Sequence, residues 1–258
     1  MMVELGREKR QCIQAICRES REVLVRGAVE GTMGRVWVPG LDGVPFCLIA
    51  SGDFAYLLGL PPKGARALDL KSQLYQSASH ALIFPENELW EQWLLEEFEG
   101  QLRMVTRYAL KKDEHHFDTD RLKANVKAVP QGIRIRRIDE RLYHLAMKEE
   151  WSRDLCSNFE DFKHFAACGF GYGAMKIHRL VAGCSAYGVS EGMMEIQVDT
   201  RKDFRRQGLA LACSSAFVLE CLEKKLIPNW DAANQQSVEL AEKLGYMFER
   251  EYQVYQLL

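Results

Sequence analysis

The sequence predicts an α/β (α+β) protein of two domains, in which a mixed, mostly antiparallel sheet is flanked by helices in the second domain. Three observations predict this class. Strand-like and helix-like runs alternate along the chain, three consecutive strand candidates between residues 171 and 200 are separated by short turns, and residues 127–132 carry the proline and glycine typical of a domain junction. We therefore expect an N-terminal α/β domain over residues 1–130 and a second domain over residues 131–258.

The composition is that of an ordinary globular protein. The 258 residues are 47% hydrophobic and 27% charged, which is enough apolar material for a sizeable core. A formal net charge of -2 provides no basic field, so we expect no nucleic-acid partner. The N-terminus lacks the apolar segment of a secretory signal, and the apolar run 209–222 is too short for a bilayer of about 30 Å. We expect a cytoplasmic protein without a membrane partner, as a monomer or homodimer.

The cysteines indicate a reducing compartment. There are 8 of them, scattered without a Cys-x-x-Cys pair, which favours reduced and mostly buried thiols over a disulfide framework. Cys184 lies on a predicted strand near the expected ligand groove. It is interpreted as a core residue, with an acyl-enzyme nucleophile as the alternative.

Hydrophobic periodicity outlines the N-terminal domain. It predicts a helix over residues 8–29 and a hairpin of two strands over residues 34–50. The α/β alternation continues through residues 53–84, and a helix with an apolar stripe follows over residues 86–103. The indoles of Trp90 and Trp93 on this helix suit core or domain-interface packing, with stacking on a cofactor as the alternative.

Residues 111–120 contain two histidines and several carboxylates. Neighbouring residues of one loop rarely converge on a single ion, and no second ligand pair stands at metal-site spacing. We interpret the segment as a solvated loop and expect no metal.

The second domain shows a regular succession of elements. Asp139 is a plausible N-cap for one helix and Asn158 for another, and Gly245 suits a left-handed helix end. The expected order is a strand at 132–138, a helix at 139–149, a helix ending at 168, strands at 171–177, 181–189 and 193–200, a helix at 208–225, a strand at 227–231, a helix at 234–244 and a strand at 246–257.

The most informative segment is residues 205–210, because a carboxylate-bearing strand precedes it and a long apolar helix follows it. The first N–H groups of a helix have no intrahelical partner, and the helix dipole adds partial positive charge there, so anionic phosphate is the natural occupant. Glycine allows a close approach of the backbone, and the arginines add cationic donors. The candidate pyrophosphate-binding residues are Arg205, Arg206, Gln207, Gly208, Leu209 and Ala210.

The pattern Arg-x-x-Gly-x-Ala at residues 205–210 resembles the acetyl-CoA-binding signature of the GNAT acetyltransferases. The flanking segments, from about residue 132 to 258, also follow the element order of that family. The run 230–234 together with 244–246 is similar to a branch of bacterial GNAT proteins that includes the zwittermicin-type antibiotic self-resistance acetyltransferases. The resemblance implies an enzyme that transfers the acetyl group of acetyl-CoA to the primary amine of a small molecule.

The resemblance also implies roles for individual residues. Glu195 stands ten residues before Arg205, where many GNAT proteins place a general base that acts through water. The backbone of Val198, Asp199 and Thr200 falls where the family strand separates from its neighbour and binds the pantetheine amide and the thioester carbonyl. Asn234, with Ser237 three residues later, resembles an element whose asparagine contacts the cofactor.

The roles of Glu195 and Asn234 have purely structural alternatives. Glu195 suits a half-buried carboxylate satisfied by backbone donors, and Asn234 suits a helix N-cap. Many family members place a proton-donating tyrosine seven residues after the asparagine, but Ala241 stands there. We interpret Tyr246 as a packing residue and not as the missing acid. The absence of that tyrosine motivates an alternative function, a catalytically weak or inactive acyl-CoA-binding regulatory protein; modification of a protein lysine or N-terminus is a third possibility.

Overall fold

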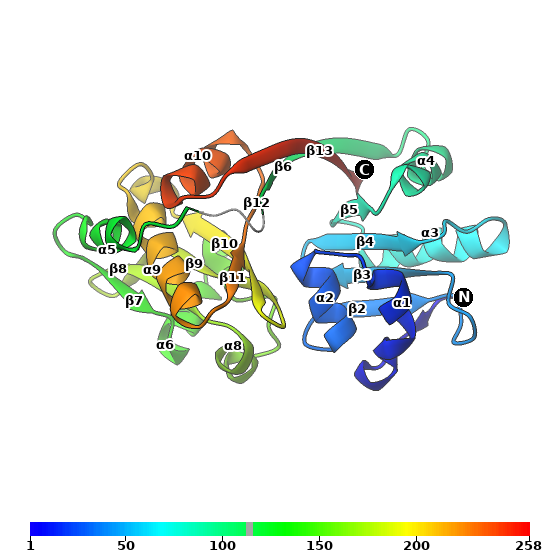
Figure 1. The fold of residues 1–258 in the computed structure, drawn as a ribbon, viewed down its shortest axis with the longest axis horizontal. Helices are drawn as coiled ribbons and strands as arrows, with labels where there is room; N and C mark the ends of the chain where they lie inside the picture. The colour runs from blue at the N-terminus through cyan, green and yellow to red at the C-terminus, as the bar shows by residue number, and fades with distance from the viewer. Residues whose placement is uncertain (112–115) are drawn as a thin grey trace. The chain divides into compact units, whose positions relative to one another are not determined.

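The computed structural model describes residues 1–111 and 116–258, and these form two compact units (Figure 1). The first unit consists of Met1–Thr106 with Tyr252–Leu258, and the second of Arg107–Glu251. This division by compactness differs from the expected boundary after residue 130. The reason is that helix α5 (Thr119–Lys127) packs on helix α9 (Leu209–Glu223) of the second unit, where Asn125 Nδ2 donates to Ser215 Oγ at 3.1 Å.

The first unit is built around the first five strands of an eight-stranded sheet, and these five follow the order of the sequence. Strands β1 to β5 are neighbours in that order, and all are antiparallel except the parallel pair β4 and β5. Its elements are β1 (Val3–Glu4), the 3-10 helix η1 (Arg7–Ile13), α1 (Gln14–Cys17), α2 (Val23–Glu30), β2 (Arg35–Val38), β3 (Phe46–Ser51), β4 (Phe54–Gly59), α3 (Ala65–Ser77), β5 (Leu82–Pro85), α4 (Glu88–Glu97) and β6 (Leu102–Leu110).

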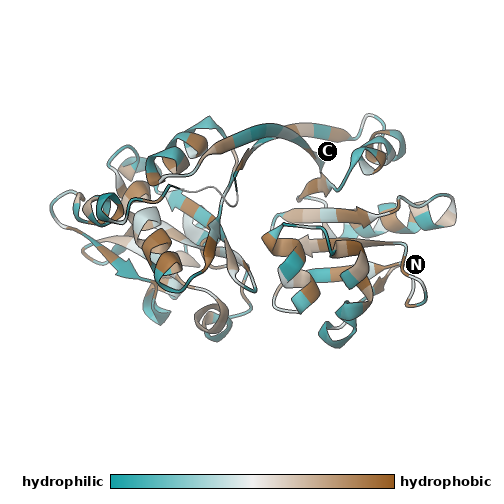
Figure 2. Ribbon diagram, in the orientation of Figure 1, coloured by the Kyte–Doolittle hydropathy of each residue, from teal (hydrophilic) through white to brown (hydrophobic). Residues whose placement is uncertain are grey.

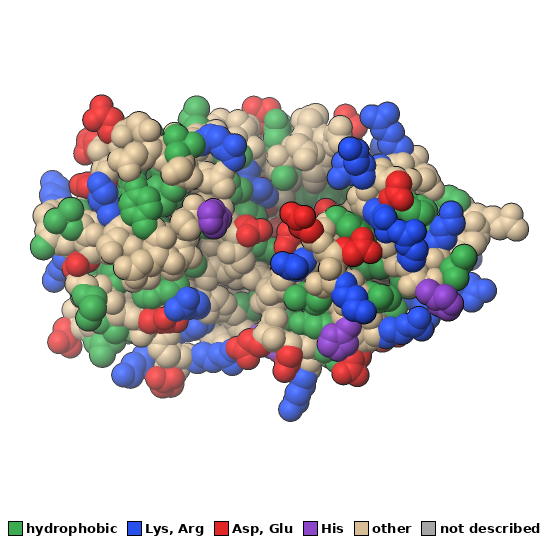
Figure 3. Space-filling view, turned by 180° about the vertical axis from the view of Figure 1, so that it is seen from behind, with side chains coloured by type: hydrophobic (Ala, Val, Ile, Leu, Met, Phe, Trp, Pro, Cys, Tyr) green, Lys and Arg blue, Asp and Glu red, His purple; other side chains and the backbone are tan. Residues whose placement is uncertain are grey.

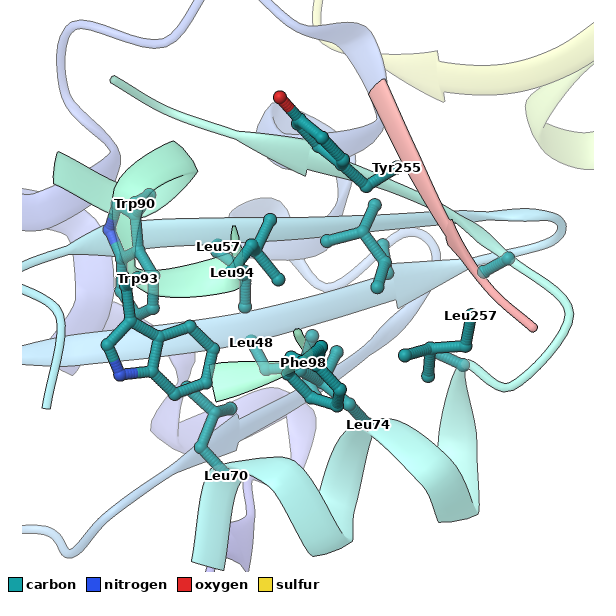
Figure 4. Close-up of a cluster of buried hydrophobic side chains, with 14 of the residues drawn as sticks. Leu48, Leu57, Leu70, Leu74, Trp90, Trp93, Leu94, Phe98, Tyr255 and Leu257 are labelled. Carbon is teal, nitrogen blue, oxygen red and sulfur yellow. The ribbon is translucent and has the colours of Figure 1, made fainter. Parts of the chain in front are cut away.

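The core of the first unit lies between this sheet and helices α3 and α4. Leu70 and Leu74 of α3 and Trp90 and Leu94 of α4 are completely buried, and Figure 4 shows them with Leu57 of β4 in one cluster. The strands β3 and β4 are drawn mainly in the colours of apolar residues in Figure 2. Both faces of these central strands are therefore covered, which explains their nearly continuous hydrophobic runs.

The second unit contains the other sheet. Its five strands have the order β11-β10-β9-β8-β7, and the pair β10 and β11 is parallel while the other pairs are antiparallel. The elements of this part of the chain are β7 (Ile133–Arg137), α6 (Glu140–Ala146), α7 (Glu150–Arg153), α8 (Phe162–Cys168), β8 (Gly171–Lys176), β9 (Arg179–Ser190), β10 (Met193–Thr200), the 3-10 helix η2 (Lys202–Phe204), β11 (Ile227–Asn229), β12 (Asp231–Ala232), α10 (Gln235–Leu244) and β13 (Phe248–Leu257). The strands β12 and β13 belong to the eight-stranded sheet, in the order β5-β13-β6-β12, and β13 passes from the second unit into the first at Tyr252.

Helix α9 is the central helix of the second unit. It packs on strands β8, β9 and β10 and is also in contact with α5 and α10. Its buried positions include several small residues, Ala212, Cys213, Ser214, Ser215 and Ala216, which let neighbouring elements approach closely. A helix that is covered on several sides needs apolar residues around most of its circumference, which explains the long apolar run in the sequence.

The two units repeat one arrangement. In each, a first strand and helices precede three antiparallel strands, a helix follows the third of these, and the next strand lies parallel to it: β4, α3 and β5 in the first unit correspond to β10, α9 and β11 in the second. No repeat is visible in the sequence by eye. The repetition is therefore one of fold.

The expected fold class and the element order of residues 131–258 are confirmed, and the hairpin of β2 and β3 also forms. Three expectations were wrong. The helix over residues 8–29 is divided into η1, α1 and α2; the helix expected to reach residue 103 ends at Glu97, because β6 begins at Leu102; and α8 is capped by Asp161, whose Oδ1 accepts from His164 N at 2.7 Å. Asn158 instead donates to Tyr187 O at 2.8 Å.

Surface charge is mixed. On the face drawn in Figure 3, Lys and Arg side chains are interspersed with Asp and Glu, as the totals of 34 basic and 36 acidic residues lead one to expect. Within the described residues, none of the helices has the length and apolar character needed to span a bilayer.

Candidate functional site

The site begins where two parallel strands of the second unit separate. β10 pairs with β11 from Met193 to Glu195, and Glu195 lies opposite Asn229. β11 ends at Asn229, whereas β10 continues to Thr200 against β9 alone in the described pairing. The edge of β10 beyond Glu195 therefore has backbone groups available for a ligand, and an extended ligand can add to such an edge. We call this the β10–β11 fork.

The residues predicted to contact the donor by their backbone lie on the separated part of β10. Val198, Asp199 and Thr200 are partly exposed and pair with Cys184, Gly183 and Ala182 of β9, respectively. The structure thus contains the strand separation expected at this position. A contact between their backbone and acetyl-CoA remains a prediction.

The loop after β10 leads directly into the N-terminus of α9. Arg205, Arg206 and Gln207 are exposed, and Arg205 Nε donates to Thr200 O at 3.2 Å. Gly208 is the residue before the helix and has φ 76°, a left-handed conformation that favours glycine. A Cβ built on Gly208 meets no atom within 4 Å, so the space beside it is open.

The helix α9 itself starts at Leu209, which is buried, while Ala210 is partly exposed. Its first N–H groups and its dipole are directed at the open space beside the loop. The loop also carries the exposed Arg205 and Arg206, so a phosphate bound there would meet N–H donors and guanidinium groups together.

Glu195 lies at the division of the fork and is almost completely buried, with 6% exposure. Its Oε2 accepts a hydrogen bond from Asn229 Nδ2, and its Oε1 accepts one from Asp231 N at 3.2 Å. The carboxylate is therefore held by a side chain of β11 and by the main chain of β12. Both the predicted base and its structural alternative are compatible with this arrangement, because a positioned base also needs fixed partners.

Asn229 and Arg107 were not predicted as site residues from the sequence. Asn229 is 2% exposed and lies opposite Glu195 only because the two strands pair in register. Arg107 of β6 donates from Nε to Asp231 Oδ2 at 2.8 Å, and β6 pairs with β12 at Asp231 and Ala109. Neither residue stands in a recognisable motif, so the strand pairing is the signal that reveals them.

Asn234 is the N-cap of α10. Its Oδ1 accepts from Ser237 N at 3.0 Å, and Ser237 Oγ accepts from Trp230 Nε1 at 3.0 Å. The capping role proposed as an alternative is thus present. Asn234 is exposed, and its contact with the donor stays a prediction.

The side chains considered as proton donors and nucleophiles are core residues. Tyr246 is buried, its OH donates to Pro228 O at 3.0 Å, and burial raises its pKa well above the ordinary value. Ala241 is completely buried in α10. Burial also raises the pKa of the Cys184 thiol, which keeps it protonated and supports its interpretation as a core residue.

Asp199 is a carboxyl group on the same strand as Glu195, and its pKa is raised above the ordinary value. Burial raises the pKa to about 6; the hydrogen bond from Gln197 Nε2 at 2.6 Å opposes this effect, and the nearby charge of Asp154 adds to it. Gln197 and Asp199 are two residues apart on β10, so they lie on one face of the strand.

Four residues of the acidic and histidine-containing segment 111–120, namely 112–115, lie outside the described residues. Among the described ones, three or more His, Cys, Asp or Glu side chains do not gather into a group that could hold a metal.

The β10–β11 fork, the exposed loop and the N-terminus of α9 follow one another in the second unit, at the place where the sequence predicts the donor site. The family model described as GNAT acetyltransferase matches residues 14–255, which is most of the chain. The protein belongs to the GNAT acetyltransferase family, whose activity is acyl transfer from acetyl-CoA.

Individual relatives agree with this family. The chain is 24% identical over 188 residues to the uncharacterized N-acetyltransferase YdfB of Bacillus subtilis strain 168, and the match covers 70% of this chain and 67% of that protein. It is similar to the crystal structure of a GCN5-related N-acetyltransferase-like protein from Streptococcus suis 89/1591, with 33% identity, a TM-score of 0.87 and coverage of 97% of this chain and 99% of that one.

A two-unit fold has a counterpart among solved structures. A tandem GNAT protein from the clavulanic acid biosynthesis pathway matches with a TM-score of 0.59 and 14% identity, over 99% of this chain and 97% of that one. At this identity the likeness is one of fold alone.

Proposed function

We propose that the protein transfers the acetyl group of acetyl-CoA to the primary amine of a small molecule by direct attack, with Glu195 as general base. The observation that carries this proposal is the position of Glu195: a buried carboxylate, held by two donors, at the point where β10 and β11 separate. A carboxylate so held is oriented before the substrates bind.

The donor would be bound by three parts of the second unit. Its pyrophosphate would lie beside Gly208 at the N-terminus of α9, where Arg205 and Arg206 add positive charge. Its pantetheine would extend along the free edge of β10 at residues 198–200. There a backbone N–H group would also stabilise the oxyanion of the tetrahedral intermediate. Asn234, Ser237 and the first turn of α9 would complete the binding surface.

In the transfer step the amine nitrogen attacks the thioester carbonyl carbon. The C–N bond forms, the C–S bond breaks, and the amine proton passes to Glu195, directly or through water. The CoA sulfur leaves as a thiolate. Because an ordinary thiol has a pKa of about 8.5, a thiolate is a tolerable leaving group near neutral pH, which agrees with alanine at position 241.

The acceptor is proposed to be an aminated antibiotic or metabolite. The resemblance of residues 230–234 and 244–246 to the zwittermicin-type self-resistance acetyltransferases supports this choice. We further propose that residues 131–258 carry the catalytic function and that the N-terminal domain shapes the acceptor site.

The second candidate is an acyl-CoA-binding regulatory protein without turnover. The observation that favours it is the buried Ala241 in the position of the family's usual proton donor. It predicts the same donor binding and differs only in the reaction.

Calorimetric titration with acetyl-CoA, with free CoA as the comparison ligand, tests donor binding first. We expect micromolar affinity, about -8 kcal/mol. A screen of primary amines that measures release of the CoA thiol then separates the two candidates: thiol release with an amine supports the enzyme, and binding without release supports the regulatory protein. Absence of binding would contradict both.

A further inference from the structure

Arg107 makes a two-point contact with Asp231. Its Nε donates to Asp231 Oδ2 at 2.8 Å, and its Nη2 donates to Asp231 O at 3.1 Å. The exposed fractions of the two side chains are 8% and 17%, so this ion pair is largely removed from solvent. A planar guanidinium that binds both the side chain and the main chain of one residue fixes the orientation of its peptide as well as its charge.

Asp231 connects this ion pair to the fork. Its N–H donates to Glu195 Oε1 at 3.2 Å, and its own carboxylate is only a few covalent bonds from that nitrogen. A second carboxylate near Glu195 disfavours the ionised form of Glu195 unless a cation compensates it. Arg107 is the cation that the structure places on Asp231.

Two uncharged groups also lie close to Glu195. Asn229 contributes its amide through a hydrogen bond to Oε2, and Tyr246 of the neighbouring segment has a phenol that burial keeps protonated. Glu195, Asp231 and Arg107 are thus linked by hydrogen bonds and an ion pair, and they come from three different strands, β10, β12 and β6.

We propose that Arg107 is a positioning residue for the transfer step. Through Asp231 it directs one N–H donor at Glu195 and offsets the negative charge that Asp231 brings, which keeps Glu195 ready to accept a proton. This inference rests on the proposed function, in which Glu195 is the base. Arg107 acts through Asp231 and not on a reacting atom.

The test is an NMR titration of protein labelled with ¹³C at the glutamate side-chain carboxyl carbons. The Glu195 signal is assigned by its loss in Glu195→Gln. We expect Arg107→Gln to raise the pKa of Glu195 by about 1 pH unit, because the Asp231 carboxylate then loses the positive charge of Arg107. Asp231→Asn should lower it, because the cation remains and the like charge is gone. The double variant should titrate close to the wild type.

The conservative variant Arg107→Lys separates charge from orientation. Lysine retains the cation but not the planar fork, so the pKa of Glu195 should stay near the wild-type value. Acetyl-CoA affinity, measured by calorimetry, should be unchanged in the whole series, because these residues lie outside the loop at the start of α9.

An unchanged pKa of Glu195 in both single variants, or a shift in the same direction in both, overturns the inference. If Arg107→Gln does not fold, Asp231→Asn alone decides, and its Glu195 must then titrate at lower pH. The proposed function fails separately: full turnover by Glu195→Gln in the amine screen would remove the base role while leaving the measured coupling between Arg107 and Glu195 in place.

Discussion

Gly64 and Gly208 occupy corresponding places in the two units: each directly precedes the helix that connects the two parallel strands of its unit. Both have positive φ, 59° and 76°, and a Cβ on either meets no atom within 4 Å. The residues around them differ in chemistry. Two residues beyond the glycine, the second unit has Ala210 and the first has Arg66. Ala210 is small and partly exposed, whereas Arg66 is long and exposed.

The first unit also differs in the hydrogen-bond partners of the backbone at the end of β4 and in the loop that follows it. Gly59 O accepts from Trp90 Nε1 at 2.9 Å, Gly59 N donates to Glu86 Oε2 at 2.9 Å, and Pro62 O accepts from Trp93 Nε1 at 3.0 Å. The two tryptophans therefore pack in the first unit and bond to its backbone, as the packing interpretation expected. Backbone groups that a pantetheine would need at this place already have partners.

This difference predicts one acetyl-CoA per chain. Calorimetry should give a stoichiometry close to one. In the described part of the chain, the second unit has a strand edge with available backbone groups next to the loop that ends at Gly208, whereas the backbone groups at the corresponding place in the first unit already have partners. Two equivalents bound per chain would contradict the prediction, as would binding that persists after the second unit's loop has been blocked.

Blocking that loop is the second prediction. Gly208→Trp should abolish acetyl-CoA binding, because the indole fills the open space beside the start of α9. Gly64→Trp is the control in the first unit: it places the same side chain on another glycine with positive φ and open space beside it, where ψ is -133° instead of the 4° of Gly208, and it should leave affinity unchanged. Gly208→Ala should retain binding at a cost of about 1 kcal/mol in stability, since it strains the backbone without filling the space. Equal losses of affinity in both tryptophan variants would contradict the placement of the loop.

The third prediction concerns Glu195. Glu195→Gln keeps the shape of the side chain but removes its basicity, so kcat should fall by about 100-fold or more while acetyl-CoA affinity stays constant. The acidic limb of the profile of kcat/KM against pH should also disappear. An unchanged pH profile would show that Glu195 has only a structural role.

The sequence was informative where short-range chemistry determines structure. β10 has the predicted bounds, Met193–Thr200, and Asp139 and Asn234 are helix caps because an Asx side chain reaches N–H groups only two or three residues ahead. Asn158 was predicted as the N-cap of the helix that Asp161 caps in the structure. The sequence does not reveal this difference, because Asn158 bonds to Tyr187, which is distant in the chain.

Residues that depend on long-range pairing were not predictable. Asn229 meets Glu195 through a parallel strand pair, and Arg107 meets Asp231 through a strand from much earlier in the chain. The strand β6 itself was not expected, because its sequence alternates polar and apolar residues only weakly after an amphipathic helix. A single sequence contains no signal for such partners beyond the residue types themselves.

The last prediction uses the pKa of Asp199, which burial raises from 3.8 to about 6. The folded protein then binds this proton more tightly than the unfolded chain does. Its contribution to stability is present below the unfolded pKa and is lost as the pH rises from about 4 to about 6.

Asp199→Asn removes the ionisable group. The free energy of unfolding of this variant, relative to that of the wild type, should therefore increase across this range and stay constant above it. Between pH 4 and pH 7 this difference in the free energy of unfolding should increase by about 1 kcal/mol, because the partial exposure of Asp199 makes it smaller than the pKa shift alone implies. Urea denaturation at pH 4, 5, 6 and 7 measures it. Asp42→Asn, which removes a charge from an exposed loop of the first unit, is the control for net charge. A gain that is equal at all four pH values would mean that Asp199 is not the group whose ionisation opposes folding.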